Sequence, residues 1–548
     1  MKKALVLLLM VCLCMLTACG REASPDNLKV MLGSNVMTLD TAQARDSASF
    51  ELIADCLDGL TQLSAEGNAV PALAESFEVS PDGKTYTFHL RDAKWANGDP
   101  VTAADFVFAW RRHCADSGEY SYMMGSTVAC VKNADAVIKG ADPATLGVSA
   151  PDAKTFVVEL EAPVSFFPSL MAFPSFYPIN EKFYNGLKPG TYGTSPETFL
   201  ANGAFALQEY LPGTANIRLK KNETYWDAAR VSLPELTYQV VGSSDNALTA
   251  FKNNTLQMVQ ISGNQVEHVK KDPKLAPNLK AVAAGSLNYL SFNQDPKNHH
   301  AGALANVNLR LALSHAVDRE SLVNNYVMDG SEATYTAVPR QFAPNADTGE
   351  FFSADQQKFA AWVSFDTEKA RSYLAKAKEE LGQETFDLEL IYASDAGDTG
   401  VKVVQALKAQ LEENLPGVTI ALQPSPKAEY LKNITSNNYD LAVTNWVPDY
   451  DDPMTFLNLW TTEGCKTGEQ WSNAEYDRII AECSTGELAA AYAARWEAMY
   501  RAEQILLENA VIAPLYTNVN AVLIADNVTG IEFHAAGVDH VYKDVKLK

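Results

Sequence analysis

The sequence predicts an α/β protein with mixed sheets, divided into two or three domains or lobes. Strand patterns and helix patterns are interspersed along the whole chain without one regular alternation, which is typical of mixed sheets. The chain has 548 residues, more than a single hydrophobic core usually organises. Hydrophobic residues make up 47% and charged residues 20% of the sequence. This composition indicates a folded globular protein and not a disordered one.

The strand predictions rest on alternation of apolar and polar residues. Residues 26–33 form the first predicted strand, and residues 86–90 and 156–160 alternate with a period of two. These two segments follow similar turns, at residues 80–85 and 150–155, and we expect them at two edges of one sheet. Two further strands are predicted over residues 511–516 and 519–524.

The helix predictions rest on caps and on apolar spacing. Thr102 and Asp105 form a capping box that begins a helix through Arg112. Asn306 is expected to cap a second helix, and a third is expected from Asp366 to a stop at Gly382. Two more helices are predicted from buried stripes: Tyr476, Ile479, Ile480 and Cys483 in the first, and Tyr492, Trp496, Met499, Leu506 and Leu507 in the second.

The N-terminus carries the pattern of a secretory signal. A basic head at residues 1–3 precedes an apolar run at residues 4–16, which is too short to span a bilayer. Leu16-Thr17-Ala18-Cys19 resembles a bacterial lipobox, in which the cysteine is acylated and becomes the mature N-terminus. The alternative is an ordinary signal peptide with an incidental cysteine. We expect a signal peptide at residues 1–18 and a tether at residues 19–26. The mature protein is then extracytoplasmic and anchored by lipid on Cys19 to the cell membrane, or to its periplasmic face.

The overall charge and the cysteines restrict the partners and the chemistry. The formal net charge is −23, which argues against nucleic acid as a partner. An oxidising compartment permits disulfides, and the pairs closest in sequence are Cys114 with Cys130 and Cys465 with Cys483. Each pair can equally remain reduced. Cys56 is predicted to be a small buried hydrophobic residue.

No recognised catalytic motif is present in the sequence. The chain lacks a GxSxG elbow, an HExxH motif, a Walker-type loop and a GxGxxG segment after a strand. His299 and His300 are adjacent in a loop that we interpret as solvated. The acidic run at residues 449–452 lacks the glycine and the glutamate of an EF-hand. The sequence therefore predicts no cofactor, no metal and no enzyme, although a catalytic carboxylate pair could be hidden among the 67 acidic residues.

Residues 445–457 form the most chemically suggestive internal segment. They follow a short apolar strand at residues 441–443, and α/β folds place ligands at the carboxyl ends of strands. Asp452 and Pro453 fit the start of a helix. Asp449 lies between Trp446 and Tyr450, and a carboxylate beside aromatic faces can hold a cation. The alternative is a surface turn with a solvated aspartate.

This segment resembles the Trp-x-x-Asp-Tyr-x-x-Pro-x-x-Phe-Leu segment of bacterial oligopeptide-binding proteins, the solute receptors of peptide ABC importers. Four other blocks resemble the same family in order and spacing: residues 94–107, 202–205, 221–226 and 307–319. The resemblance implies a two-lobed, periplasmic-binding-protein-like clamp of three domains. It places lobe 1 (domain I) at residues 27–57, 180–290 and 515–548, the extra domain II at 58–179, and lobe 2 (domain III) at 291–514. The chain is expected to cross between lobes near Ser291 and Pro514.

The resemblance also implies roles for individual residues. Asp449 is expected to bind the α-ammonium of a peptide, and Trp446 to form the wall of a neighbouring pocket. Backbone groups of two segments are expected to pair with the peptide main chain; their residues include Asn445, Trp446 and Val447 in one segment and Arg45, Asp46 and Ser47 in the other. The sequence departs from the family pattern at Val443, where some members have an arginine, and at Lys427, where they have a tryptophan. Lys427 is a candidate anchor for the peptide carboxylate.

The function implied by the resemblance is capture of short peptides, in extended form between two lobes, and their delivery to the permease subunits of an ABC importer. We expect the protein to be a monomer. A non-peptide ligand such as a nickel chelate, haem or an oligosaccharide is the main alternative. A less favoured alternative is that the protein is a surface hydrolase or an adhesive lipoprotein.

Overall fold

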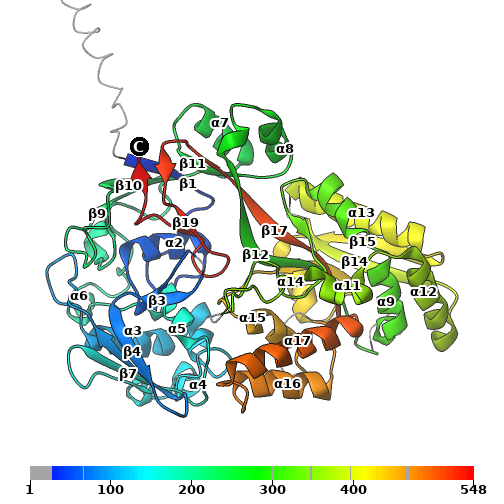
Figure 1. The fold of residues 1–548 in the computed structure, drawn as a ribbon, viewed down its shortest axis with the longest axis horizontal. Coiled ribbons are helices and arrows are strands. Elements are labelled where there is room, and N and C mark those ends of the chain that lie inside the picture. Colours follow the sequence, from blue (N-terminus) through cyan, green and yellow to red (C-terminus); the bar gives the residue numbers. More distant parts are fainter. Residues whose placement is uncertain (1–26, 66, 298–301, 346–347, 395–396, 463–467) are drawn as a thin grey trace, which may run out of the picture.

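Two lobes share one continuous mixed sheet (Figure 1). A computed structural model describes residues 27–65, 67–297, 302–345, 348–394, 397–462 and 468–548. The large sheet has eleven strands, in the order β15-β14-β16-β12-β17-β11-β1-β10-β9-β8, with β13 paired to β17. The predicted α/β class with mixed sheets is confirmed, because parallel pairs such as β1–β10 and antiparallel pairs such as β12–β16 occur in the same sheet.

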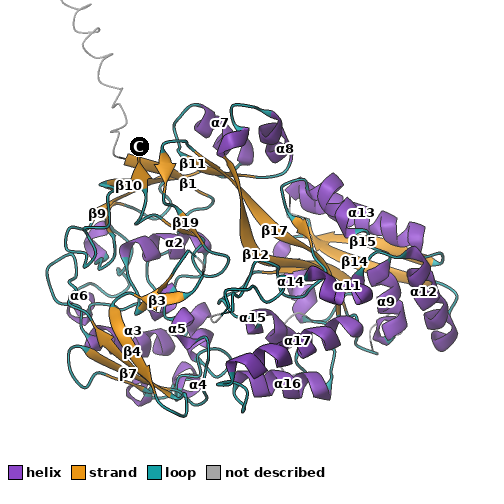
Figure 2. Ribbon diagram, viewed as in Figure 1, coloured by secondary structure: helices purple, strands orange, loops and turns teal. Residues whose placement is uncertain are grey.

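The two ends of the sheet belong to different lobes. The strands at the lobe 1 end are β1 (Asn27–Leu32), β8 (Phe205–Glu209), β9 (Asn216–Lys221), β10 (Glu235–Val240) and β11 (Met258–Ile261). The strands at the lobe 2 end are β13 (Glu332–Ala333), β14 (Phe386–Ala393), β15 (Val418–Ser425) and β16 (Leu441–Trp446). The helices that pack around the lobe 2 strands are α9 (Val307–His315), α12 (Thr367–Leu381), α13 (Gly397–Asn414) and α14 (Lys427–Thr435) (Figure 2).

Two long neighbouring strands run through both lobes. They are β12 (Leu279–Phe292) and β17 (Ile512–Ile524), which pair antiparallel along most of their length. The lobe 1 half of β17 pairs with β11, whereas the lobe 2 half of β12 pairs with β16. The β12–β17 register shifts between Ala283 and Leu287. Between them, Gly285 has a φ of +62° and its Cα faces the backbone of Ala535 too closely for a side chain.

The strand β17 corrects the prediction of two separate strands at residues 511–516 and 519–524. Thr517 and Asn518, which lie between the two predicted strands, belong to the same continuous strand. In the structure Thr517 pairs with Leu287 in register, and Asn518 accepts a hydrogen bond of 2.8 Å from the Asn288 amide. These contacts come from β12, far away in sequence, and keep the chain extended through the polar positions.

A separate four-stranded sheet has the order β4-β5-β7-β6, with β4 (Ala74–Val79), β5 (Thr85–Leu90), β7 (Thr155–Glu159) and β6 (Val148–Ser149). The two strands predicted from alternation are β5 and β7. They are adjacent and central, so their placement at the two edges was wrong. The true edge strands are β4 and β6. They were not predicted because β4 is largely exposed and β6 has only two residues, so neither gives a clear alternation of apolar and polar residues.

The predicted helix signals are confirmed. Helix α3 (Ala103–Asp116) begins at the Thr102–Asp105 capping box. Asp366 caps α12, which ends at Gly382 in the left-handed conformation, and Asn306 caps α9. The remaining α-helices of the described ranges are α2 (Ser47–Cys56), α4 (Ala134–Ile138), α5 (Phe167–Leu170), α6 (Glu181–Asn185), α7 (Ser244–Lys252), α8 (Asn264–Lys271), α10 (Arg319–Leu322), α11 (Ala360–Val363), α15 (Met454–Leu457), α16 (Ala474–Ser484) and α17 (Tyr492–Glu508).

One hydrophobic core connects lobe 1 and the four-stranded sheet with α15, α16 and α17. A second core lies between the lobe 2 sheet and its helices. The predicted stripe of α16 is buried, and so are Trp496, Met499, Leu506 and Leu507 of α17, whereas Tyr492 is half-buried. Within the described ranges, no helix combines the length and apolarity that crossing a bilayer requires.

The cysteines in the described ranges are free thiols. Cys114 lies on the buried face of α3, and the Cys130 thiol donates to the Ser126 carbonyl at 3.2 Å, so of the two alternatives left open for this pair the structure has the reduced one. Cys483 is also free and buried, against the Arg495 carbonyl. Cys465 lies outside the described residues, as does Cys19, and the statements about both remain predictions. Cys56 is fully buried in α2, as expected.

Candidate functional site

The loop at residues 446–452 leaves the carboxyl end of β16 and meets the opposite lobe. Strand β16 pairs with β12 up to Trp446, after which the chain turns. The Tyr450 ring is buried and stacks on the Phe166 ring, with centroids 4.8 Å apart and planes inclined by 6°. Phe166 directly precedes α5, which lies beside the four-stranded sheet in the other half of the molecule (Figure 1), so this stack holds the loop against that half.

Asp449 contacts the opposite lobe through a tyrosine that the sequence did not indicate. The Tyr122 hydroxyl, in the 3₁₀ helix η1 (Glu119–Met124), donates to Asp449 Oδ2 at 2.6 Å. The Asp449 backbone N–H donates to Thr455 Oγ1 at 3.2 Å. Burial and the nearby Asp449 charge both raise the pKa of Tyr122, which keeps its hydroxyl protonated as a donor.

Trp446 and Asp449 line the same cavity, of about 330 Å³, which we call the Trp446 cavity. Tyr122 and Val128 contribute from one side, whereas Asn458 contributes from the lobe 2 side. The indole N–H of Trp446 is buried and has no hydrogen-bond partner among the described residues. Buried donors are normally satisfied, so this N–H is an exception to that rule.

The second predicted segment lies at the start of α2. Asp46 caps this helix, since its carboxylate accepts from the Ser49 backbone at 2.9 Å and from the Ser49 hydroxyl at 2.6 Å. Arg45 is exposed and forms an ion pair of 3.6 Å with Glu119, at the beginning of η1. Ser47 is exposed in the first turn of α2.

Helix η1 connects this segment to Asp449. The Tyr120 ring lies 5.0 Å from the Phe50 ring of α2 and 6.0 Å from the Tyr122 ring. Burial raises the pKa of Tyr120, and the charges of both Asp449 and Asp46 raise it further. The two predicted segments therefore lie on either side of one tyrosine pair.

The other predicted residues are more peripheral. Asn445 is exposed, and the Val447 side chain is 57% exposed. Lys427 is exposed at the first residue of α14 and is not among the residues that line the Trp446 cavity. The side-chain environments give no separate support to the backbone-pairing role expected for Asn445 and Val447, or to the role expected for Lys427.

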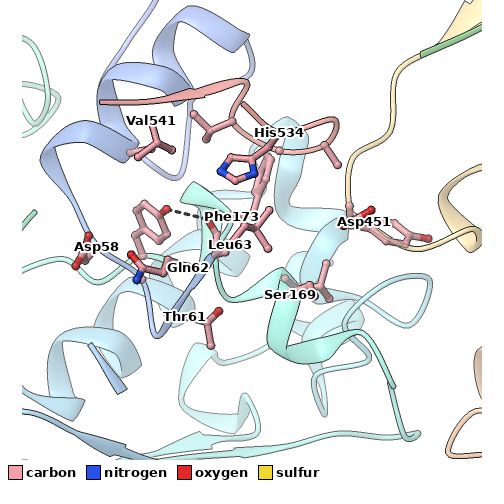
Figure 3. A pocket seen from close by; sticks show the side chains of 18 of the residues that line it. Asp58, Thr61, Gln62, Leu63, Ser169, Phe173, Asp451, His534 and Val541 are labelled. Carbon is pink, nitrogen blue, oxygen red and sulfur yellow. Dashed lines mark hydrogen bonds between the residues drawn. The ribbon is translucent and has the colours of Figure 1, made fainter. Parts of the chain in front are cut away.

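A second cavity adjoins the first, and we call it the central cavity (Figure 3). Asp449 and Tyr450 line both cavities. On the lobe 1 side, Asp58 accepts from the Tyr225 hydroxyl at 2.9 Å and from the Trp226 indole at 2.8 Å. Burial raises the pKa of Asp58 despite these bonds.

A third cavity, of about 440 Å³, lies beside the crossing strands, and we call it the hinge-side cavity. It is lined by residues 281–283 of β12, 341–344 and 531–536, and it shares Asp451 and His534 with the central cavity. Burial lowers the pKa of His534 to about 4, so this imidazole is neutral at pH 7. The three cavities form a row along the loop at residues 446–452, with Asp449 and Asp451 at the two junctions.

The fold and this row of cavities define a class of protein: a two-lobed binding protein whose site lies between the lobes. A family model of bacterial extracellular solute-binding proteins, family 5, matches residues 68–468. The chain therefore belongs to this family, and it is an extracytoplasmic binding protein and not an enzyme.

Individual relatives match almost the whole chain. The dipeptide-binding protein of Lactococcus lactis is 30% identical over 97% of this chain and 96% of its own. The structure of Listeria monocytogenes OppA bound to peptide has a TM-score of 0.74 and 30% identity, covering 95% of this chain and 99% of that one. An oligopeptide ABC transporter substrate-binding domain from Bacillus anthracis has a TM-score of 0.75 and 32% identity, covering 96% and 99%.

Proposed function

We propose that this protein binds short peptides in extended form between its lobes and delivers them to the permease of an ABC importer. The observation that carries the proposal is the Asp449 carboxylate, which lies at the junction of two cavities and is oriented by Tyr122 from the opposite lobe. A carboxylate in this position can accept charge-assisted hydrogen bonds from a peptide α-ammonium. The relatives named for dipeptides and oligopeptides, and the peptide-bound neighbour, support the same ligand class.

The other expected contacts belong to the same proposal. Trp446 forms a wall of the pocket for a ligand side chain. The backbone of residues 445–447 and of residues 44–49 pairs with the peptide main chain, which gives affinity without sequence selection. Lys427 is proposed as the anchor for the peptide carboxylate.

The domain division is part of the proposal. Residues 27–57, 180–290 and 515–548 form domain I, residues 58–179 form domain II, and residues 291–514 form domain III. The two crossing strands act as the hinge between open and closed lobes. Ligand that contacts both lobes favours the closed form, because it binds that form with additional interactions.

We also propose that the mature protein is a monomer tethered by acyl chains on Cys19. Replacing Cys19 with alanine is expected to move the protein from the membrane fraction to the soluble fraction, since two or more acyl chains are needed for stable anchoring. The measurement is fractionation after growth with labelled palmitate. Label retained on the Cys19→Ala protein would refute anchoring at this residue.

The Asp449→Asn substitution tests the ammonium site. Asparagine keeps the size of the side chain but removes its charge, so the affinity for short peptides is expected to fall by about 1–3 kcal/mol, the range for a hydrogen bond to a charged group. Isothermal titration calorimetry with free and N-acetylated peptides is the measurement. Acetylated peptides should bind weakly to both proteins.

The matched control is Asp387→Asn, at an exposed position of β14. This variant should bind free peptides with wild-type affinity. If Asp449→Asn also keeps wild-type affinity, or if acetylated peptides bind as tightly as free ones, Asp449 does not hold the ammonium.

The ligand class itself is tested with protein purified from cells and then denatured. Mass spectrometry of the released molecules should show a mixture of short peptides with free N-termini. A single non-peptide compound, such as a metal chelate or an oligosaccharide, would replace the peptide assignment by that ligand.

A further inference from the structure

Asp451 is a carboxylate at a cavity junction without a cationic partner among the described residues. Its Oδ1 accepts one hydrogen bond, from the Ala343 backbone N–H at 3.0 Å. The salt bridges within the described ranges include its neighbour Asp452, which pairs with Arg495, but not Asp451. Asp451 lines both the central cavity and the hinge-side cavity (Figure 3), where it lies across the central cavity from Asp58.

The charges around this junction are mostly negative. Asp58 and Asp449 line the central cavity, and Glu532 lines the hinge-side cavity. The cation that lines the central cavity, Lys543, stabilises the Asp58 charge and donates a hydrogen bond to Gln62.

Burial raises the pKa of Asp451 to about 7, against the lowering effect of the single bond from Ala343. A buried carboxylate that accepts a single hydrogen bond and has no ion pair is stabilised by a cationic ligand group. Such a group supplies the opposite charge and further hydrogen-bond donors. The hinge-side cavity, at about 440 Å³, has room for a long side chain.

We propose that Asp451 binds a positively charged side chain of the bound peptide, and that this receptor therefore selects peptides with lysine or arginine among their first three residues. The inference rests on the proposed function, because it takes Asp449 as the site of the α-ammonium. Residues 449 and 451 are two positions apart, so their Cα atoms lie within about 7 Å, the length of two extended residues. A side chain that reaches Asp451 must therefore come from a residue close to the peptide N-terminus.

The test compares three pairs of alanine-based tripeptides, with lysine or norleucine at the first, second or third position. Norleucine has a side chain of similar length without the ammonium group. Calorimetry at pH 8 with wild-type protein should show at least a tenfold preference for lysine at one position. In Asp451→Asn the ratio of the two affinities should fall close to 1, whereas Asp387→Asn should retain the wild-type ratio.

Asparagine can still accept the Ala343 hydrogen bond, and thermal unfolding of Asp451→Asn and of a second variant, Asp451→Ser, checks that both are folded. Equal affinity for lysine and norleucine peptides at all three positions in wild type overturns the inference. A preference for lysine that persists in the folded Asp451 variants also overturns the inference. If neither lysine nor norleucine peptides bind wild-type protein, the proposed function fails, and the inference fails with it.

Discussion

Replacing Arg495 with methionine is expected to destabilise the protein by about 3–5 kcal/mol, the range for breaking a buried ion pair from one side. Arg495 Nη1 and Nη2 lie 2.7 and 2.8 Å from the two carboxylate oxygens of Asp452, and the side chains are 1% and 6% exposed. The Arg495 Nε also donates to the Cys483 carbonyl at 2.9 Å. Removal of the guanidinium leaves a buried negative charge directly behind the Asp449 loop.

Equilibrium urea denaturation of wild type and Arg495→Met measures this effect. The matched control on the same helix is Arg501→Met, because Arg501 pairs with Glu475 at 3.2 Å with both side chains about half exposed. Exposed pairs contribute at most about 1 kcal/mol. The double variant Arg495→Met/Asp452→Leu should recover much of the loss, since it removes both charges. Equal losses for Arg495→Met and Arg501→Met would contradict the prediction.

The second large effect concerns Glu503, a fully buried carboxyl group in α17. Its Oε1 accepts from the backbone N–H groups of Ala337 and Val338 at 2.8 and 2.9 Å, whereas its Oε2 has no hydrogen-bond partner among the described residues. Burial raises the pKa of Glu503 to about 7, and the two N–H bonds oppose this rise.

A carboxyl group whose pKa is higher in the folded state than in the unfolded state takes up a proton on folding at pH values between the two. Its contribution to stability is complete below the unfolded value, about 4.5, and is lost as the pH rises through about 7. A shift of this size corresponds to about 3 kcal/mol. Glutamine can keep the bonds to Ala337 and Val338 but cannot ionise. The free energy of unfolding of Glu503→Gln, minus that of wild type, is therefore expected to increase by about 3 kcal/mol between pH 4.5 and pH 8.

Urea denaturation at several pH values provides the measurement. The matched control, Glu475→Gln, replaces a carboxylate at a half-exposed position and should show a nearly constant difference. If the difference between Glu503→Gln and wild type does not depend on pH, Glu503 does not hold a proton in the folded protein.

Local signals in the sequence predicted local structure well. The caps at Thr102, Asn306 and Asp366 depend on residues within one helical turn, and each was found in place. The segment after β16 was also recognisable, because Trp446, Asp449 and Tyr450 lie within five positions of one another.

Features that depend on distant residues could not be predicted in the same way. The Tyr122–Asp449 hydrogen bond joins residues 327 positions apart, and the sequence around Tyr122 has no pattern that distinguishes it from an ordinary aromatic loop. The continuity of β17 through Thr517 and Asn518 depends on partners in β12, which are also remote in the sequence. The position of Asp451 at a cavity junction could not be predicted either, because the two cavities are lined by residues from many separate regions of the chain, between Ala54 and Lys543.

The position of β17 in the sheet imposes an order on folding. Lobe 1 contains β1 near the N-terminus, yet β11 pairs with β17, and the Tyr542 hydroxyl donates to Glu51 Oε1, 491 residues away. A chain that lacks its last tenth cannot form these contacts, so lobe 1 remains unfinished until synthesis is nearly complete. The complete native fold therefore forms late. This order suits a protein that functions outside the compartment where it is made.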